Sequence, residues 1–287
     1  MACSSCAPSP RSSMPTWLRQ ASRAAVFHAS SRSHVSANSD QPKLAGGESS
    51  CNDCVLFSLC FAQDIDADAR ERLSDVIQRR QGVQRSAHLH HGGQPARQLT
   101  VLRSGSIKAY EVSREGDELV TGFYLPGDVV GLDAFSMGHH AGSAVALEEC
   151  RLCEIPVADF QKMLGESPRL NQVMLRLLAE EMAEARKLLL VVGRLDARTR
   201  VALFLLSLSR RFERRQLDPD LFRLSMDRRD IANYLGLTIE TVSRTLSALQ
   251  RDDVIHIRGK HVRILDREAL AEQAHVEEAS PSRQAVG

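Results

Sequence analysis

The sequence contains no long apolar run and carries little net charge. No stretch approaches the roughly eighteen uninterrupted apolar residues that a membrane-spanning helix needs, so we expect no transmembrane segment. The formal net charge of the 287 residues is only +1, so a nucleic-acid surface must come from local clustering of cations. A hydrophobic content of 43% and a charged content of 25% are ordinary for globular proteins, and the length predicts about two domains.

Acidic residues are missing from the start of the chain. No Asp or Glu precedes Asp40, and residues 1–50 are rich in Ser, Ala, Pro and Arg. This composition cannot bury much apolar surface, so we predict a disordered extension over 1–50, and we expect a flexible tail over 273–287. The same composition mimics an organellar transit peptide, an alternative that the rest of the chain disfavours.

Seven cysteines give an odd count, and no apolar signal segment precedes them. This argues against the disulfide framework of a small secreted protein. The cysteines form three groups, each with a C-x-x-C spacing: Cys3/Cys6, Cys51/Cys54/Cys60 and Cys150/Cys153. In a reducing cytosol such spacing indicates metal ligation or redox chemistry.

The central group places three thiols within residues 51–60. Thiolates at this density favour soft metals, namely Zn(II), Cu(I) or an iron–sulfur cluster. A cluster is held by four thiolates, so it needs one more ligand elsewhere. Downstream, Cys150 and Cys153 are the two candidates, and spacing alone leaves both open.

The next segments predict one helix followed by many short strands. Apolar residues between Asp64 and Arg80 follow helical spacing. From residue 82 to about 158, β-rich runs alternate with turn signals such as Glu115-Gly116-Asp117, which predicts an antiparallel barrel or jelly roll. The expected strands are Leu99–Leu102, Ile107–Val112, Leu119–Tyr124, Val129–Leu132, Ser143–Leu147 and Arg151–Ile155. For the nearby His88, His90 and His91 we expect a solvated loop rather than a metal site.

A long helix is predicted over roughly residues 168–192. Its apolar positions are separated by alternating steps of three and four residues, a heptad seam typical of a helix that pairs with its own copy. The seam residues are Leu175, Leu178, Met182, Ala185, Leu189 and Val192. The alternative is a helix packed on its own domain, which would have a wider apolar stripe.

The C-terminal part reads as two short helices joined by a glycine turn. A helix over Met226–Leu235 ends at Gly236, and Thr238 can cap a second helix that runs to about Gln250. The second helix is free to project Glu240, Thr241, Ser243 and Arg244 toward DNA bases. A β-hairpin wing follows, in which Lys260 would meet phosphates. An ordinary helical hairpin is the alternative, but residues 227–263 hold seven Lys/Arg against five Asp/Glu, which favours DNA binding.

From Cys51 to Leu270 the chain resembles the CRP/FNR superfamily, and within it the FNR-type branch of oxygen-responsive iron–sulfur regulators. The resemblance is carried by Cys51-x2-Cys54-x5-Cys60, Arg103-Ser104-Gly105-x-Ile107-Lys108, Gly138-His139-His140, Leu152-Cys153-Glu154-Ile155-Pro156, Leu208-Ser209-Arg210-Arg211-Phe212 and Asn233-Tyr234-Leu235-Gly236-Leu237-Thr238-x-Glu240-Thr241-x-Ser243-Arg244.

The resemblance implies a cofactor, a mechanism and partners. It assigns a 4Fe–4S cluster to Cys51, Cys54, Cys60 and Cys153, the last of which occupies the family's position for the fourth ligand. The cluster would promote homodimerisation and DNA binding under anaerobic conditions, and oxygen would convert it to a 2Fe–2S form and then destroy it. Glu240, Ser243 and Arg244 would read a TTGAT-N4-ATCAA-like palindrome. The implied protein is a cytoplasmic transcription regulator, not an enzyme, and it contacts no membrane.

The implied fold is α+β. Residues 51–165 would form the cluster-binding segment and a β-barrel sensor domain of the cyclic-nucleotide-binding type. Residues 166–194 would be the dimerisation helix, and residues 195–272 a winged helix-turn-helix domain. Gly116 and Asp117 resemble a family surface that touches RNA polymerase, although a plain hairpin turn is the alternative.

Two departures from the family pattern bear on ligands and regulation. The stretch 131–143 contains no arginine to hold the phosphate of a cyclic nucleotide, so we expect no such ligand. Ala185 stands where the best-known pattern has an acidic residue that weakens dimerisation of the cluster-free protein. Two rival hypotheses remain: a zinc-bound constitutive DNA-binding protein, or a regulator controlled by a thiol–disulfide switch at the cysteines.

Overall fold

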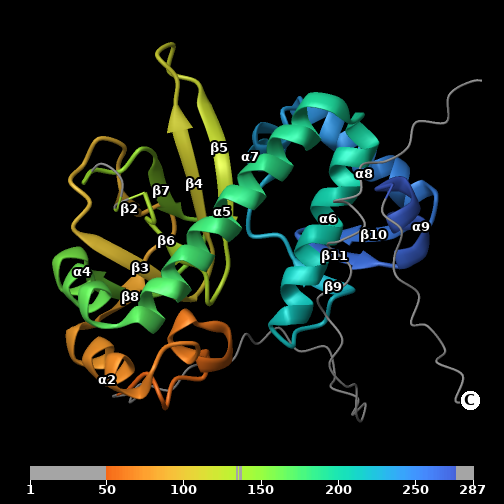
Figure 1. Ribbon diagram of the computed structural model, residues 1–287. Coiled ribbons are helices and arrows are strands. Elements are labelled where there is room, and N and C mark those ends of the chain that lie inside the picture. The colour runs from red at the N-terminus through yellow and green to blue at the C-terminus, as the bar shows by residue number, and fades with distance from the viewer. Residues whose placement is uncertain (1–49, 134, 136–137, 276–287) are drawn as a thin grey trace, which may run out of the picture.

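The computed structural model describes residues 50–133, 135 and 138–275, shown as ribbon in Figure 1. The expectations for residues 1–49 and 276–287, and for Cys3 and Cys6, lie outside these ranges. None of the described helices is long and apolar enough to span a membrane.

The described chain begins with a cysteine-bearing segment that leads into one helix. It contains the 3-10 turns η1 (Phe57–Leu59) and η2 (Phe61–Gln63) and helix α2 (Ala67–Val76). Asp66 caps α2 by accepting a hydrogen bond from the Ala69 N–H at 2.8 Å. The expectation of helix up to Arg80 is wrong over its last residues, because Ile77 is extended and the next residues pair with a strand.

Eight strands of the following region form two antiparallel sheets. The first sheet has the order β1-β8-β3-β6 and the second β2-β7-β4-β5. Their bounds are β1 (Gln78–Val83), β2 (His88–His90), β3 (Gln98–Ser104), β4 (Ile107–Val112), β5 (Glu118–Tyr124), β6 (Val129–Val130), β7 (Ser143–Ala146) and β8 (Cys150–Pro156). The antiparallel arrangement confirms the expected class of fold, although the described strands stay in two separate sheets and do not close into a barrel.

Two helices follow the last strand of this β domain. Helix α4 (Val157–Glu166) leads to the long helix α5 (Pro168–Arg194), which Ser167 caps by accepting from the Leu170 N–H at 3.1 Å. The first turns of α5 are buried at Leu170, Val173 and Met174, in a core shared with α2 and β3. Beyond them α5 runs across the molecule toward α7, as Figure 1 shows.

The C-terminal domain is a winged helix-turn-helix, as predicted. Its elements are α6 (Ala197–Arg214), β9 (Leu221–Arg223), α7 (Arg228–Leu235), α8 (Ile239–Arg251), β10 (Ile255–Arg258), β11 (His261–Ile264) and α9 (Arg267–Gln273). Gly236 ends α7 with a left-handed φ of 62°, and Thr238 caps α8 by accepting from the Thr241 N–H at 3.1 Å. The three strands form an antiparallel sheet of order β10-β11-β9.

The β domain and the C-terminal domain share one apolar core. Phe123 of β5 packs against Phe204 of α6 and Tyr234 of α7, with ring centroids 6.1 and 5.2 Å away. The backbone N–H of Val120 donates to the Asn233 side chain at 2.6 Å. The first helix of the DNA-reading motif is therefore docked on the edge strand of the β domain.

Candidate cysteine centre and nucleic-acid interface

Three cysteines lie on the segment that covers one end of the β domain. Arg70 of α2 holds this segment together, because its guanidinium donates to the carbonyl oxygens of Ala62 and Ile65 at 3.0 and 2.9 Å. The N–H of Cys51 donates to the Ser74 hydroxyl at 3.1 Å, and the Cys51 side chain is buried. Cys54 and Cys60 are half-buried.

The two candidates for a fourth ligand lie on opposite faces of the same sheet. Cys153 is paired with Arg79 and Val101 on the neighbouring strands and belongs to the apolar core that contains Cys51 and Cys60. Cys150 lies inside the sandwich, in a separate core, where its Sγ donates to the Glu148 carbonyl at 3.3 Å. Side-chain alternation along a strand explains this separation, since residues an odd number of positions apart face opposite sides.

The thiols of Cys51, Cys54, Cys60 and Cys153 influence one another electrostatically. Burial, together with the neighbouring Cys51, Cys153 and Cys54 thiols, raises the pKa of Cys60 to about 12. Burial also raises the pKa of Cys153 to about 11, although the cations Arg103 and Arg79 act against this rise. The four thiols thus lie close enough to interact electrostatically, and Arg79 and Arg103 favour the thiolate form of Cys153.

The donor set is chemically suited to an iron–sulfur cluster, because cysteine thiolates hold such clusters. In the described chain, no three His, Cys, Asp or Glu side chains are close enough together to hold one metal ion. A zinc ion draws its thiolates to about 2.3 Å from one centre, whereas each thiolate of a 4Fe–4S cluster binds a different iron. Four thiols that share a site without converging on one point are therefore compatible with a cluster.

The cysteine segment is also connected to the start of α5. The Ser167 hydroxyl donates to Asp66 Oδ2 at 2.7 Å, and this hydrogen bond, with that from the Ala69 N–H, holds the pKa of Asp66 below its usual value. Arg169 Nε donates to the Asp64 carbonyl at 2.7 Å, and Arg176 forms an ion pair with the Asp64 carboxylate. A displacement of the cysteine segment would consequently disturb the contacts that hold the first three turns of α5.

The exposed surface of α8 carries the predicted DNA-reading residues. Val242, Leu246 and Leu249 are buried on its inner face. Glu240 and Arg244 are exposed, and Ser243 is half-buried. The Thr241 hydroxyl lies 2.9 Å from that of Thr238, so it belongs partly to the helix cap. A shallow groove on this surface is lined by Ser243, Arg244, Ser247 and Arg251.

The wing lies beside the beginning of the helix-turn-helix. Lys260, in the turn between β10 and β11, donates from Nζ to the Ser225 carbonyl at 3.0 Å, two residues before the Asp227 cap of α7. This contact fixes the wing turn next to α7 and holds the Lys260 ammonium there. An ammonium has further donors, which remain suited to a phosphate.

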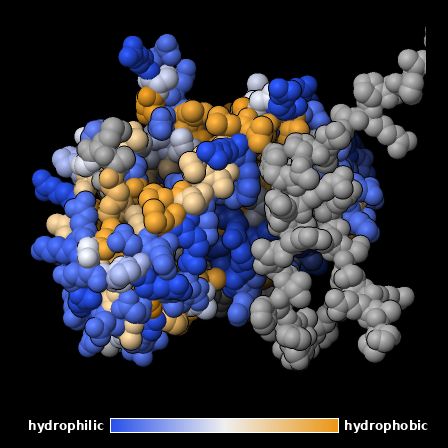
Figure 2. All heavy atoms as spheres, viewed as in Figure 1, coloured by the Kyte–Doolittle hydropathy of each residue, from blue (hydrophilic) through white to orange (hydrophobic). Residues whose placement is uncertain are grey.

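The heptad positions of α5 are largely exposed in the single chain. Leu175, Met182 and Leu189 are 67%, 51% and 74% exposed, and Leu178 is 38% exposed. Ala185 is exposed, whereas Val192 is half-buried and lies near Gly236 in the helix-turn-helix turn. Figure 2 shows apolar residues gathered along this face of the molecule. Such an exposed apolar stripe is typical of a surface that pairs with another chain.

Gly116 and Asp117 lie in the exposed turn between β4 and β5. Gly116 has a φ of 91°, which favours glycine, and the Ser113 N–H donates to the Asp117 carbonyl at 2.8 Å. A side chain added at Gly116 would meet no other atom within 4 Å. The turn therefore projects freely from the body of the β domain.

The histidine prediction is wrong for His88 and His90, whereas His91 is exposed and lies outside the strands, as expected. His88 and His90 belong to strand β2 instead of a solvated loop. The His90 ring stacks on that of His140 with centroids 3.6 Å apart, and burial together with the neighbouring His140 lowers the pKa of His90 to about 4. Strand β2 was not predicted, because Leu89 is its only apolar residue and no alternating pattern marks it.

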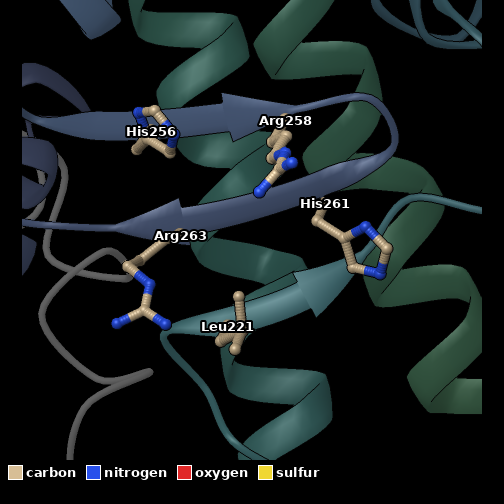
Figure 3. A pocket seen from close by; sticks show the side chains of 5 residues that line it. All are labelled: Leu221, His256, Arg258, His261 and Arg263. Carbon is tan, nitrogen blue, oxygen red and sulfur yellow. The ribbon is translucent and has the colours of Figure 1, made fainter. Parts of the chain in front are cut away.

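The sequence analysis also did not predict the positive charge beside Cys153 or on the exposed face of the wing, where Figure 3 shows Arg258 and Arg263. Arg79 and Arg103 beside Cys153 could have been suspected only after the register of β1 and β3 with β8 was known. The exposed cations of the wing, by contrast, do have a sequence signal. In β10 and β11 polar and apolar residues alternate, and every polar residue there is His or Arg.

Comparisons with known proteins agree with this architecture. Residues 199–273 match the family described as Crp-like helix-turn-helix domain, and residues 80–167 match the cyclic nucleotide-binding domain. The fumarate and nitrate reduction regulatory protein of Escherichia coli (strain K12) is 39% identical over 224 residues, covering 78% of this chain and 90% of that protein. The protein of the same name from Salmonella typhimurium is 39% identical over 221 residues, covering 77% and 88%.

A solved structure supports the same assignment. FixK2 from Bradyrhizobium japonicum is 28% identical and superposes with a TM-score of 0.65, covering 72% of this chain and 100% of that one. Together with the helix-turn-helix and its exposed reading surface, these likenesses lead to one conclusion. The chain belongs to the CRP/FNR family of DNA-binding transcription regulators and is not an enzyme.

Proposed function

We propose that the protein is an oxygen-responsive regulator that holds a 4Fe–4S cluster with Cys51, Cys54, Cys60 and Cys153. The observation that carries the proposal is the gathering of these four thiols on one face of the β domain, with Cys150 on the other. A bound cluster supplies an oxygen-sensitive redox centre at this place. The proteins named fumarate and nitrate reduction regulator, to which the chain is similar, favour the same reading.

The residues between the cysteines and α5 provide a path for regulation. Asp64 and Asp66 lie within the six residues after Cys60 and bond to Arg169, Arg176 and Ser167 around the start of α5. Ordering of the cysteine segment would hold these contacts and thereby orient α5. A ligand that binds only the ordered state shifts the population toward it. Orientation of α5 in turn decides whether two exposed apolar stripes can pair.

The partners follow from dimerisation. A two-fold dimer along α5 would present two copies of α8 to successive major grooves of a TTGAT-N4-ATCAA-like palindrome. Glu240, Thr241, Ser243 and Arg244 would face base edges, with Lys260 at the backbone. Gly116 and Asp117 would touch RNA polymerase. We place the regulator in the cytoplasm, where its DNA is, and assign it no membrane partner.

A cyclic nucleotide is not part of the proposal. Asp133 Oδ2 accepts a hydrogen bond from the Ala141 N–H at 2.7 Å, and Asp133 Oδ1 lies 3.2 Å from His140 Nδ1. The Asp133 carboxylate therefore already binds the Ala141 N–H and the His140 ring, in the stretch where cyclic-nucleotide receptors of the family hold a phosphate. A phosphate at this position would meet like charge and no arginine.

The proposal is tested on full-length protein purified without oxygen. We expect a brown protein with visible absorbance, iron and sulfide in a ratio near one, and a dimer that binds the palindrome. Exposure to air should bleach the absorbance and release the DNA. Zinc without iron, together with air-insensitive DNA binding, would instead support the constitutive alternative. A disulfide found by nonreducing mass spectrometry would support the thiol switch.

A further inference from the structure

One turn of the β domain contacts both the cysteine segment and the DNA-binding domain. This β5–β6 turn contains Pro126, Gly127 and Asp128. It is anchored on β3, because the Gly127 N–H donates to the Leu102 carbonyl at 2.8 Å and the Leu102 N–H donates to the Asp128 carbonyl at 3.0 Å. Closely packed structure transmits strain, so the contacts on the two sides of this turn depend on each other.

On one side, the β5–β6 turn packs against the residue that precedes Cys60. Gly127 has a φ of 94°, and a Cβ added there would lie 2.9 Å from Leu59 Cβ and 3.0 Å from the Leu59 carbonyl oxygen. Glycine is the residue that allows such a close approach at this φ. The position of the backbone between Leu59 and Cys60 therefore determines where the β5–β6 turn can lie.

On the other side, Asp128 binds two arginines at the end of α6. Asp128 Oδ1 accepts from Arg215 Nη2 at 2.7 Å, and Asp128 Oδ2 forms an ion pair with Arg211. Arg215 also donates to the Pro126 carbonyl at 2.8 Å and to the Arg211 carbonyl at 2.9 Å. The Arg215 side chain is only 8% exposed. Charge-assisted hydrogen bonds of a buried guanidinium are strong and directional, so they fix the end of α6 on the β5–β6 turn.

A second ion pair between the two domains is anchored elsewhere. Arg223 of β9 binds Glu148 at 2.7 Å, and Glu148 accepts from the Ser106 hydroxyl at 2.9 Å. Ser106 lies between β3 and β4, so this pair ties the C-terminal domain to a different turn of the β domain. The two ion pairs therefore allow a matched comparison.

We propose that Asp128 is a positioning residue that couples the cysteine segment to α6 within one protomer. Ordering of the cysteine segment then orients the winged helix-turn-helix through the β5–β6 turn, in addition to the route through α5. The inference rests on the proposed function, which makes the cysteine segment the part that responds to oxygen. It adds that a dimer with ordered cysteine segments binds DNA more tightly than a dimer without them.

The test follows backbone hydrogen exchange in full-length protein that is purified without oxygen and then exposed to air. In the wild type, loss of the cluster should speed exchange in residues 56–60 and in residues 211–217, because both sides of the β5–β6 turn loosen together. In Asp128→Asn, residues 211–217 should exchange faster before exposure to air, and air should no longer change them. Residues 168–176 of α5 should still respond to air as in the wild type.

A second measurement separates coupling from stability. Asp128→Asn should keep its iron, its sulfide and its dimer, and should bind the palindrome about tenfold more weakly without oxygen. A residue with a merely structural role would lower the free energy of unfolding but would leave the response of residues 211–217 to air in place.

Two further variants serve as controls. Arg215→Lys retains the charge but cannot reach Asp128 and both carbonyl groups together, so it should behave as Asp128→Asn does. Arg223→Gln breaks the other ion pair between the domains and should leave the response of residues 211–217 to air unchanged.

A persisting response of residues 211–217 in both Asp128→Asn and Arg215→Lys would overturn the inference. An equal loss of this response in Arg223→Gln would also overturn it. If the wild type holds no cluster, the proposed function fails, and the coupling is judged in the metal-free protein. Coupling is reciprocal, so Asp128→Asn should then speed exchange at residues 56–60 as well as at residues 211–217. A change at residues 211–217 alone would refute the coupling.

Discussion

Lys108 of β4 forms an ion pair with Asp230 of α7, with 2.9 Å between Nζ and Oδ1. The two side chains are only 11% and 13% exposed. Glu118 completes the pair at 3.1 Å from Nζ. Burial lowers the pKa of Lys108, but the hydrogen bonds to Asp230 and Glu118 outweigh burial and raise it above its usual value. The stabilisation is therefore fully present below the ordinary lysine pKa and is lost only as the pH rises through the raised pKa.

Removing this ammonium should loosen the DNA-binding domain from the β domain. Lys108→Met leaves Asp230 largely buried without its cation, so we expect a loss of about 3 kcal/mol in the free energy of unfolding. Urea denaturation followed by circular dichroism measures this loss. The double variant with Asp230→Asn should be more stable than Lys108→Met alone, because no unpaired charge is left.

The matched control for this experiment is Lys187→Met. Its ion pair with Glu184 is exposed on α5, so its loss should cost less than about 1 kcal/mol. Equal costs for the two lysine variants would show that the Lys108 pair contributes no more than a surface contact.

Local rules predicted the helix-turn-helix but not its docking. Gly236 predicts the end of α7, because glycine readily adopts the left-handed conformation found there. Thr238 predicts the start of α8, because its hydroxyl can cap the helix. Strand β1 was missed, since Val83 is its only buried residue and no alternation marks it. Lys108 and Asp230 are 122 positions apart, and no local pattern relates two charges at such a separation.

At the cysteine site, too, local spacing was predictable and long-range contacts were not. The cysteine spacing indicated three ligands between residues 51 and 60. It did not distinguish Cys150 from Cys153 as the fourth ligand. The resemblance favoured Cys153, and the alternation of β8 now supports this choice. Arg79 comes near Cys153 only through strand pairing, which composition does not reveal.

The cysteine assignment makes a prediction for single variants. Serine at Cys51, Cys54, Cys60 or Cys153 should abolish the brown chromophore and anaerobic DNA binding, since one corner of the cluster loses its thiolate. Cys150→Ser is the matched control and should keep iron and sulfide, because its side chain faces the interior of the sandwich. If Cys150→Ser loses iron while Cys153→Ser retains it, the fourth ligand has been assigned wrongly.

The apolar stripe of α5 predicts where dimerisation is sensitive. Leu178→Glu or Met182→Glu would place two symmetry-related charges in an apolar interface, so the dimer should weaken by about 3 kcal/mol, or about a hundredfold. Analytical ultracentrifugation without oxygen measures this effect. Ala183→Glu, at an exposed position off the stripe, is the control and should leave the dimer intact. An intact dimer in all three variants would remove α5 from the interface.

The exposed turn at Asp117 should matter for activation rather than for DNA binding. Asp117→Ala removes an acidic group that points into solvent, so we expect lower transcription from an activated promoter with unchanged operator affinity. In-vitro transcription and a binding assay on the same protein separate the two effects. Glu115→Ala, in the same exposed turn, tests whether any acid there suffices. A parallel fall in DNA binding would favour a plain structural turn.

Arg244 and Lys260 should differ in what they contribute to DNA affinity. Arg244 is exposed on α8 and can pair bidentately with guanine O6 and N7, worth roughly 1–3 kcal/mol of discrimination. Arg244→Ala should therefore weaken binding to TTGAT half-sites and relax the preference at the G·C pair. Lys260 is held against Ser225 beside α7. We expect it to contact only the DNA backbone, so Lys260→Ala should weaken all sequences about equally and flatten the salt dependence. Binding of both variants to operators substituted at the guanine distinguishes these roles, because only a base contact makes the loss depend on the substituted base. Equal losses on every operator would show that Arg244 is a second phosphate contact and that α8 reads the half-site through other residues.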